Sequence, residues 1–344
     1  MSSSKDVLCS AVHPLRVLVA VLSFISLMGA QSGRIAFVSD RTGTWQIYTM
    51  NPDGSDQDQV TNLAPTDDDG LFPHISPNGQ KIIFAYNNGE GPDLYVINVD
   101  GTGLTQLTKD HGSFFPCWSP DGRHIAFTMN SKVGTGVIAI MTANGSGKRR
   151  ILTTDRWGSV APIYTPKGKQ MVFQSEMGGF VSAAWIMNAD GSHQRRLTQP
   201  ALKAAASSIS PDGKRVLIFD NLNSPPAIRN EIFEMNLDSS RLKRLAPLPS
   251  FHHDLWPSYS PDGSKIAFVS DRSSSDITEF TYGTFDIFTM DSDGSELTDV
   301  APSVGSCPKD GNCVDALWGG PAAFPIECDG WHFDQQFRDK LLMV

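Results

Sequence analysis

The chain has 344 residues, of which 40% are hydrophobic and 19% are charged. Its 37 acidic and 28 basic residues give a formal net charge of -9. This composition is typical of a globular chain with many turns and excludes a disordered one. The acidic balance also argues against non-specific nucleic-acid binding and against charge-driven docking on anionic lipid. We therefore expect no nucleic-acid partner.

The first thirty residues have the pattern of a secretory signal. Lys5 and Arg16 precede the uncharged run 17–30, which ends in Gly29 and Ala30. Fourteen uncharged, mostly apolar residues are too few to span a bilayer of roughly 30 Å comfortably. We predict a signal peptide over 1–30 and a periplasmic or secreted mature chain without a membrane-spanning domain. The alternative is an uncleaved membrane anchor.

Cysteine usage agrees with export. Cys307 and Cys313 bracket a short polar loop, and a disulfide between them is expected in an oxidising compartment. Two free thiols, or a metal pair lacking its partners, are the alternatives. Cys117 lies in an apolar run and is expected to be a small buried hydrophobic residue.

Two turn signatures recur along the chain with a period near 45 residues. In the first signature Pro presets φ, Asp or Asn follows, and Gly tolerates a positive φ. Its copies are SPNG 76–79, SPDG 119–122, TPKG 165–168, SPDG 210–213 and SPDG 260–263. The second signature is NPDG 51–54, NVDG 98–101, TANG 142–145, NADG 188–191, NLDS 236–239 and DSDG 291–294. Two tight turns in each unit of this length indicate a β-propeller blade.

Short β-rich runs lie between the turns. Each first turn is followed by a run rich in Ile, Val and Phe, as at 82–86 and 125–129. Each second turn is preceded by another, as at 94–98, and two further runs complete a set of four strands per unit. We predict an all-β fold, a six-bladed propeller of four-stranded blades over residues 31–320.

The ends of the repeat predict how the ring closes. The first unit begins at 34–37, in its second strand, so its innermost strand is missing at the N-terminal side. Residues 314–318 resemble the start of a first strand. We predict that this C-terminal strand completes blade one and removes the open edges, so that the ring is monomeric. The tail 321–344 does not continue the repeat.

The pattern [FW]-P-x-[WY]-S-P-D-G, then I-A-F-x-S-D-R, then I-[YF]-x-M-[ND]-x-D-G resembles the TolB-type propeller family over about 34–320. The resemblance implies a propeller that binds a protein partner in the cell envelope. TolB itself carries an α/β domain before its propeller, whereas the signal segment of this chain leads directly into blade one. Related propellers also include pectin-fragment lyases and lactonase-like enzymes.

The order of strands and turns places both tight turns of each blade on one face and the variable connections on the other. Binding residues are concentrated on variable loops held by a rigid scaffold, so we expect the working surface on the loop face. The residues predicted to contact a partner there are Asp68, His111, Trp157, His252, His253 and Asp254.

Each candidate also has a structural interpretation. The Asp67–Asp69 run is typical of a solvated loop, and the loop histidines are more often surface residues than metal ligands. The repeated pairs Asp40-Arg41 and Asp271-Arg272 indicate a structural ion pair or turn. We predict a non-catalytic partner-binding propeller without cofactor or metal. The alternatives are a metal-assisted carbohydrate-acid lyase or lactonase-like hydrolase at the channel mouth, and a structural module that uses the outer blade edges.

Overall fold

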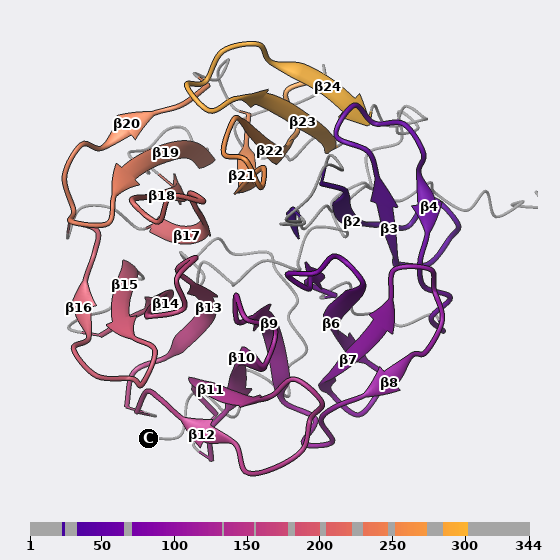
Figure 1. The fold of residues 1–344 in the computed structure, drawn as a ribbon, viewed down its shortest axis with the longest axis vertical. Helices are drawn as coiled ribbons and strands as arrows, with labels where there is room; N and C mark the ends of the chain where they lie inside the picture. The colour runs from indigo at the N-terminus through magenta and orange to yellow at the C-terminus, as the bar shows by residue number, and fades with distance from the viewer. Residues whose placement is uncertain are drawn as a thin grey trace, which may run out of the picture.

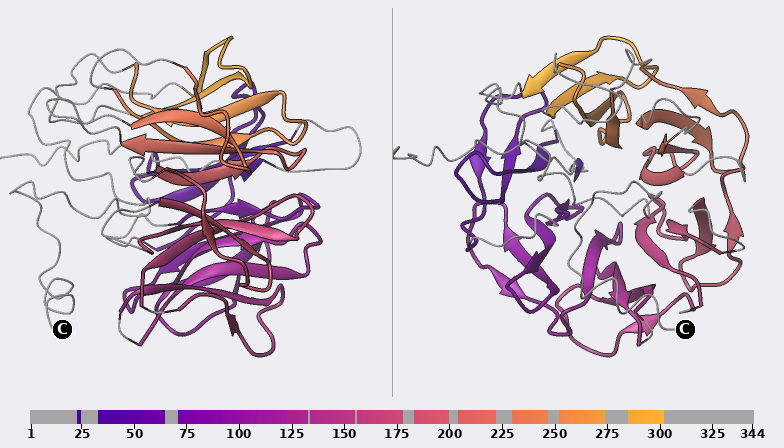
Figure 2. Two further views of the ribbon diagram at one scale, coloured as in Figure 1. Left: turned by 90° about the vertical axis from the view of Figure 1, so that its left-hand side faces the viewer. Right: turned by 180° about the vertical axis from the view of Figure 1, so that it is seen from behind.

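The computed structural model describes residues 23–24, 33–64, 71–132, 134–154, 156–177, 183–199, 204–221, 230–246, 252–273 and 285–301. These residues form six antiparallel four-stranded sheets arranged around a central axis, which confirms the predicted six-bladed β-propeller (Figure 1). Seen from the side, the blades form a short cylinder (Figure 2). None of the described residues builds a helix with the length and apolar character needed to cross a membrane.

Each blade runs from its innermost to its outermost strand in chain order. Blades 1 to 3 are β1 (Ser23–Phe24), β2 (Ile35–Ser39), β3 (Gln46–Met50), β4 (Asp58–Gln59); β5 (His74–Ile75), β6 (Lys81–Asn87), β7 (Pro92–Asn98), β8 (Thr105–Gln106); β9 (Ser113–Trp118), β10 (His124–Asn130), β11 (Gly136–Thr142), β12 (Arg150–Ile151). Blades 4 to 6 are β13 (Ser159–Tyr164), β14 (Gln170–Ser175), β15 (Ala183–Asn188), β16 (Arg195–Arg196); β17 (Ala204–Ile209), β18 (Arg215–Asn221), β19 (Asn230–Asn236), β20 (Lys243–Arg244); β21 (Asp254–Tyr259), β22 (Lys265–Ser270), β23 (Asp286–Asp291), β24 (Thr298–Ala301).

The core lies between the faces of neighbouring blades. The second strand of each blade is short and rich in β-branched and aromatic residues, which suit a pleated surface buried on both sides. Phe84, Phe127 and Phe268 stand at equivalent positions of β6, β10 and β22 and are fully buried. Truncating such a side chain to Ala costs about 3–5 kcal/mol. The hydrophobic clusters each join adjacent blades, so the ring is stabilised blade against blade.

Local side-chain hydrogen bonds form the two repeated turns. In the first turn of blade 3, Ser119 Oγ accepts from the His124 N–H at 2.9 Å and donates to Asp121 Oδ1 at 2.6 Å. Gly122 adopts a φ of +68° there. In the second turn of blade 2, Asp100 Oδ1 accepts from the N–H and hydroxyl of Thr102, which lowers the pKa of Asp100. The turn carboxylates are therefore engaged locally.

Ring closure differs from the sequence-based expectation. The inner position of blade 1 is held by β1, with Ser23 opposite Ala36 and Phe24 opposite Ile35. Residues 314–318, which the repeat pattern assigns to this position, lie outside the described residues. β1 lies within the segment 1–30 that the sequence pattern assigns to a signal peptide. Strand pairing needs only free backbone groups, so this apolar segment satisfies the edge of β2 while it is present, and its cleavage would leave the edge open to the predicted C-terminal strand.

The first and last blades pack against each other. The apolar cluster of blade 6 continues into blade 1, where it includes Ile35 and Phe37. A Cβ added to Gly54 in the second turn of blade 1 would clash with the Val300 carbonyl of blade 6. The described strands thus form a closed ring in which the turns of one blade press on the outer strand of its neighbour.

The repeated Asp-Arg pairs have a structural role in stacking. Arg41 lies over the rings of Phe37 and Tyr48, with its guanidinium carbon 5.2 and 4.7 Å from the ring centroids. Arg272 lies in the same way over two phenylalanine rings, at 5.2 and 5.4 Å. In each case the arginine Nε donates to the Ser two residues earlier, Ser39 for Arg41 at 3.0 Å. Cation–π contact helps to hold both arginines, and Arg272 also pairs with the Asp254 carboxylate at 2.6 Å.

Candidate functional site

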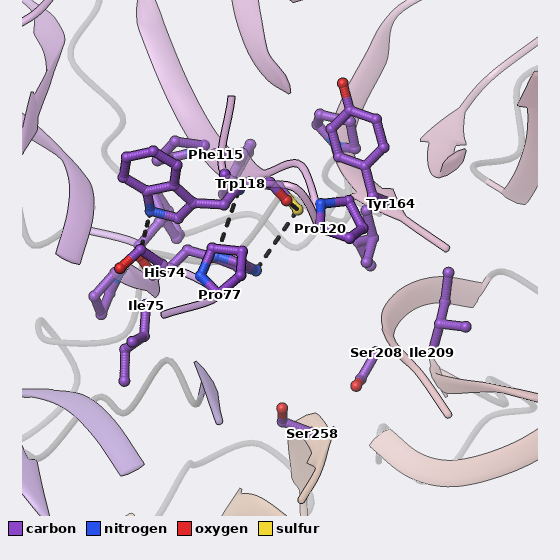
Figure 3. Close-up of a pocket in the computed structure, with 18 of the residues that line it drawn as sticks. His74, Ile75, Pro77, Phe115, Trp118, Pro120, Tyr164, Ser208, Ile209 and Ser258 are labelled. Atoms are coloured by element: carbon purple, nitrogen blue, oxygen red, sulfur yellow. Dashed lines mark hydrogen bonds between the residues drawn. The ribbon is translucent and has the colours of Figure 1, made fainter. Parts of the chain in front are cut away.

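The central channel contains a cavity of about 1330 Å³, lined by the inner strands and first turns of blades 2 to 6 (Figure 3). The cavity lies toward the face that carries the Ser-Pro-Asp-Gly turns. Eight prolines and seven aromatic residues contribute to its wall. They are Pro73, Pro77, Pro116, Pro120, Pro162, Pro166, Pro211 and Pro261, with Phe72, Phe115, Trp118, Tyr164, Phe219, Trp256 and Tyr259. Rigid apolar walls of this kind suit apolar or aromatic groups of a ligand.

Backbone strain holds several of these side chains in place. Phe72, Phe115, Ala161 and Trp256 each precede a proline and have φ between +41° and +52°. Bulky residues rarely adopt the left-handed region, which costs about 1–3 kcal/mol per residue. In blades 3, 4 and 6 this position coincides with a shift in strand register. The bulge removes the proline from the hydrogen-bond ladder and presents the preceding residue to the cavity.

The aromatic side chains form two groups on the channel wall. The rings of Phe72 and Phe115 have centroids 4.1 Å apart, and those of Phe219 and Trp256 are 6.3 Å apart. Phe72, Phe115 and Trp256 are partly exposed and line the cavity. Preformed aromatic surfaces lose little entropy on binding, so they are effective anchors for a partner.

A network of hydrogen bonds ties blade 2 to blade 3 beside the cavity (Figure 3). The Trp118 N–H donates to His74 Nδ1 at 3.5 Å, and Trp118 Nε1 donates to the His74 carbonyl at 3.2 Å. His74 Nε2 lies 3.6 Å from the Cys117 Sγ. Burial lowers the pKa of His74 to about 4 and raises the pKa of Cys117 to about 12. Both groups are therefore neutral, and their role is structural.

The cavity wall carries little charge. Lys81 and Asp121 are the lining residues with a formal charge at neutral pH, because His74 is neutral. Lys81 Nζ donates to Asn98 Oδ1 at 3.2 Å, and the Asp121 carboxylate is held by Ser119 and the Arg123 N–H. An acidic sugar would need several cations to replace its lost hydration. The described wall supplies one cation, Lys81.

His111 lies on the loop face, apart from the cavity, and remains accessible. Its Nδ1 is 3.1 Å from the Asp93 carboxylate and its Nε2 is 3.8 Å from Glu90, with 42% of its side chain exposed. Asp93 is buried and also accepts from Thr108 and from the N–H groups of Asp110 and His111. This carboxylate organises the connection between blades 2 and 3 and orients the imidazole.

Trp157 is half-buried at the start of blade 4. The Arg156 guanidinium carbon lies 5.2 Å from its ring centroid. The indole thus has one face covered by a cation, and it does not line the channel cavity. It remains a candidate for contact on the loop face.

The segment His252–Asp254 is largely buried between blades 5 and 6. His252 keeps 13% of its side chain exposed, His253 is 4% exposed and Asp254 is completely buried. The His253 N–H donates to Asp271 Oδ1 at 2.6 Å, and Arg272 donates to Asp254 Oδ2 at 2.6 Å. Burial lowers the pKa of His253 to about 4 and raises that of Asp254 to about 6. These contacts make the segment part of the blade interface.

The structure does not gather the predicted contact residues into one site. Asp68 lies outside the described residues, as do Cys307 and Cys313, and none of the other five lines the cavity. Across the described ranges, no three His, Cys, Asp or Glu side chains come close enough together to hold a metal ion. The aromatic residues of the channel wall were missed as candidates. The sequence signal for Phe72, Phe115 and Trp256 is an aromatic residue directly before proline at one repeat position.

The fold and its channel define a closed six-bladed β-propeller. A family model for the TolB beta propeller domain matches residues 64–225. "Protein TolB homolog" of Chlorobaculum tepidum is 32% identical over 120 residues, which are 34% of this chain and 26% of that protein. Residues 64–225 therefore carry repeats of the TolB-type β-propeller family, and the match spans about a quarter of this curated relative.

Two solved structures share the architecture. The crystal structure of TolB from Acinetobacter baumannii aligns with a TM-score of 0.64 at 22% identity, covering 81% of this chain and 66% of that one. Oligogalacturonate lyase from Vibrio parahaemolyticus aligns with a TM-score of 0.56 at 12% identity, covering 86% of this chain and 81% of that one. Likeness at these identities concerns the fold, on which binding proteins and enzymes both occur.

Proposed function

We propose that this chain is a non-catalytic, TolB-like propeller of the cell envelope or the secreted fraction that binds a protein partner in its central channel. The observation that carries the proposal is the cavity of about 1330 Å³ with its rigid, largely uncharged wall of proline and aromatic side chains. Such a wall matches the apolar and aromatic side chains of a polypeptide segment.

Strain at the channel wall supports a binding role. Phe72, Phe115 and Trp256 are held in the left-handed region, in the bulge before a proline, which fixes the direction of their side chains before any ligand binds. Partly exposed aromatic residues on a rigid scaffold are the kind that dominate binding energy at protein interfaces. The loop face offers His111 and Trp157 as a second, smaller set of contacts.

The carbohydrate-acid lyase alternative finds less support in the wall. Binding and turnover of a polyanionic sugar need clustered cations or a metal centre near the reacting carbon. The described lining residues include Lys81 as their cation and carry a carboxylate at Asp121. The proposed function therefore keeps the channel as a binding site for protein.

The test is partner capture from native envelope extract with the full chain, followed by reconstitution with the purified partner. Phe115→Ala and Trp256→Ala remove the channel aromatics, and His111→Ala and Trp157→Ala are the matched variants on the loop face. We expect the channel variants to weaken the affinity by about tenfold or more and the loop variants by less than about twofold. Thermal melts establish that each variant is folded.

Loss of binding only in the loop variants would contradict the channel assignment and favour the loop face. Unchanged binding in all four variants would favour a structural module that uses its outer edges. Turnover of a sugar-acid substrate by the wild-type chain that is lost in the channel variants would overturn the non-catalytic role.

A further inference from the structure

The outer wall of the ring is divided by charge. Five of the six residues in the outer strands of blades 3, 4 and 5 are Arg or Lys, namely those of β12, β16 and β20 apart from Ile151. The outer strands of the other three blades, β4, β8 and β24, contain no Arg or Lys. This concentration occurs in a chain whose formal net charge is -9. We call the surface formed by β12, β16 and β20 the basic wall.

Two further cations extend the basic wall. Lys148 and Arg241 precede β12 and β20, are exposed, and form no ion pair with another described residue. Carboxylates are present nearby, since Arg244 pairs with Glu231. The turn carboxylates of Asp190, Asp238 and Asp293 also lie near cations of the wall, and hydrogen bonds from the serine two residues later lower their pKa and keep them negative. With Glu231 they make four carboxylates against the seven cations of the wall. The wall keeps a positive balance.

Some of the cations are held in place by the neighbouring blade. Arg195 donates to the Leu237 carbonyl at 2.7 Å, and Lys243 donates to the Asp293 carbonyl at 2.8 Å. A backbone carbonyl does not neutralise a full positive charge, so these side chains are ordered and still attract anions. Charged residues on an edge strand also prevent edge-to-edge pairing. The outer strands of blades 1, 2 and 6 have no Arg or Lys, so edge protection alone does not explain the concentration.

Apolar side chains are interleaved with the cations. Ile151 is 54% exposed beside Arg150, and Leu242 is 48% exposed between Arg241 and Lys243. A purely polar polyanion makes no use of such residues. A polypeptide that combines Asp or Glu with apolar side chains would satisfy both.

The curvature of the wall favours a flexible ligand over a flat one. In Figure 1, β12, β16 and β20 lie on successive blades at the outside of the ring and face different directions. A flat bilayer surface would therefore touch only part of the wall at a time. An extended chain can follow the curve and reach all three strands.

From these observations we propose that the outer wall of blades 3 to 5 is a docking surface for an acidic, partly apolar polypeptide segment in extended form. This surface is separate from the channel, and the inference does not rest on the function proposed for it. Guanidinium groups suit carboxylates because they can donate two parallel hydrogen bonds.

The experiment measures binding of the full chain to fluorescent poly-L-glutamate and to a random glutamate–tyrosine copolymer, by anisotropy at low and high salt. Lys148→Glu with Arg241→Glu reverses two charges on the basic wall. Arg123→Glu with Lys214→Glu is the matched control, because it makes the same change in net charge at exposed residues of the first turns. Thermal melts verify the fold of both double variants.

We expect the wall variant to weaken binding of both polymers by about tenfold or more at low salt, and the control by less than about threefold. Wild-type affinity should fall as salt is raised. Ile151→Ser with Leu242→Ser should remove the preference for the copolymer over poly-L-glutamate while leaving the binding of poly-L-glutamate unchanged.

Equal effects of the wall and control variants would overturn the proposal, as would a failure of the wild-type chain to bind either polymer. Two further ligands test the class of partner. Wall-dependent binding of phosphatidylglycerol vesicles without copolymer binding would indicate a membrane surface. Wall-dependent binding of polygalacturonate that is tighter than binding of the copolymer would indicate an acidic glycan, and either result would refute a polypeptide partner.

Discussion

His74 makes the fold sensitive to acid in a way that can be measured. Burial lowers its pKa from 6.5 to about 4, so the folded protein holds the imidazole neutral where the unfolded chain binds a proton. Stability is therefore complete above pH 6.5 and is lost as the pH falls through 6.5 toward 4. The full shift corresponds to about 3 kcal/mol, and the part lost between pH 7 and pH 5 is about 2 kcal/mol. The ring lines the channel and retains some contact with solvent, so these are upper limits.

The change to test is His74→Asn, because the Asn Oδ1 can replace the imidazole Nδ1 as the acceptor for the Trp118 N–H. The assay is urea unfolding at pH 7 and pH 5, with tryptophan fluorescence as the measure of unfolding. The quantity to compare is the difference in unfolding free energy between the two pH values. We expect this difference to be smaller in the variant by as much as about 2 kcal/mol.

Comparing each protein with itself at two pH values removes the packing cost of the substitution. Subtracting the pH difference of the variant from that of the wild type then cancels the contributions of His253, which acts in the same direction, and of Asp254. The pKa of Asp254 is raised from 3.8 to about 6, so its protonation favours the fold as the pH falls and offsets about 1 kcal/mol. Identical pH dependence in wild type and His74→Asn would refute the assignment of a buried, neutral imidazole at this position.

Three other predictions concern the ring. Gly54→Ala should destabilise the fold by about 3 kcal/mol or more, because the added Cβ meets the outer strand of blade 6. Gly43→Ala is the control: Gly43 has a φ of +88° and open space around it, so the change should cost about 1 kcal/mol. Similar melting temperatures for the two variants would show that the ring does not close through this contact. Ser239→Gly should raise stability by about 0.5–1 kcal/mol, since Ser239 has a φ of +74° at the turn position occupied by glycine in most other blades, and a lower urea midpoint would contradict this. Arg272→Met should cost about 3–5 kcal/mol at pH 8 by leaving the Asp254 carboxylate buried without its cation, with partial recovery in the double variant with Asp254→Asn; an additive double variant would show that the two side chains are not coupled.

The repeat architecture could be predicted from the chain because its causes are local. Each blade depends on a proline-containing turn, a glycine at a positive φ and a short β-branched run, and all three are visible within a few neighbouring residues. The spacing of these turns gives the length of a blade, and the six copies of the second turn give the number of blades. Phe84, Phe127 and Phe268 are all fully buried because they occupy the same position of the repeat.

The candidate site was less predictable because it depends on contacts between distant segments. The variable loops differ in composition from the repeated turns, and His253 and Asp254 were predicted to contact a partner because they lie in such a loop. Tertiary packing buries both against Arg272 and Asp271. Burial of a polar residue depends on its partners, which can be far away in sequence, so loop composition cannot reveal it.

Sequence by itself determined the all-β class, the six blades and the turn chemistry, since each follows from short-range preferences of the backbone. The tertiary structure decided which strand closes blade 1, where β1 pairs with β2, and which side chains face the channel. It also decided that the outer strands of blades 3 to 5 form one basic surface. These features arise from the assembly of blades around an axis, and no single segment of the chain contains that information.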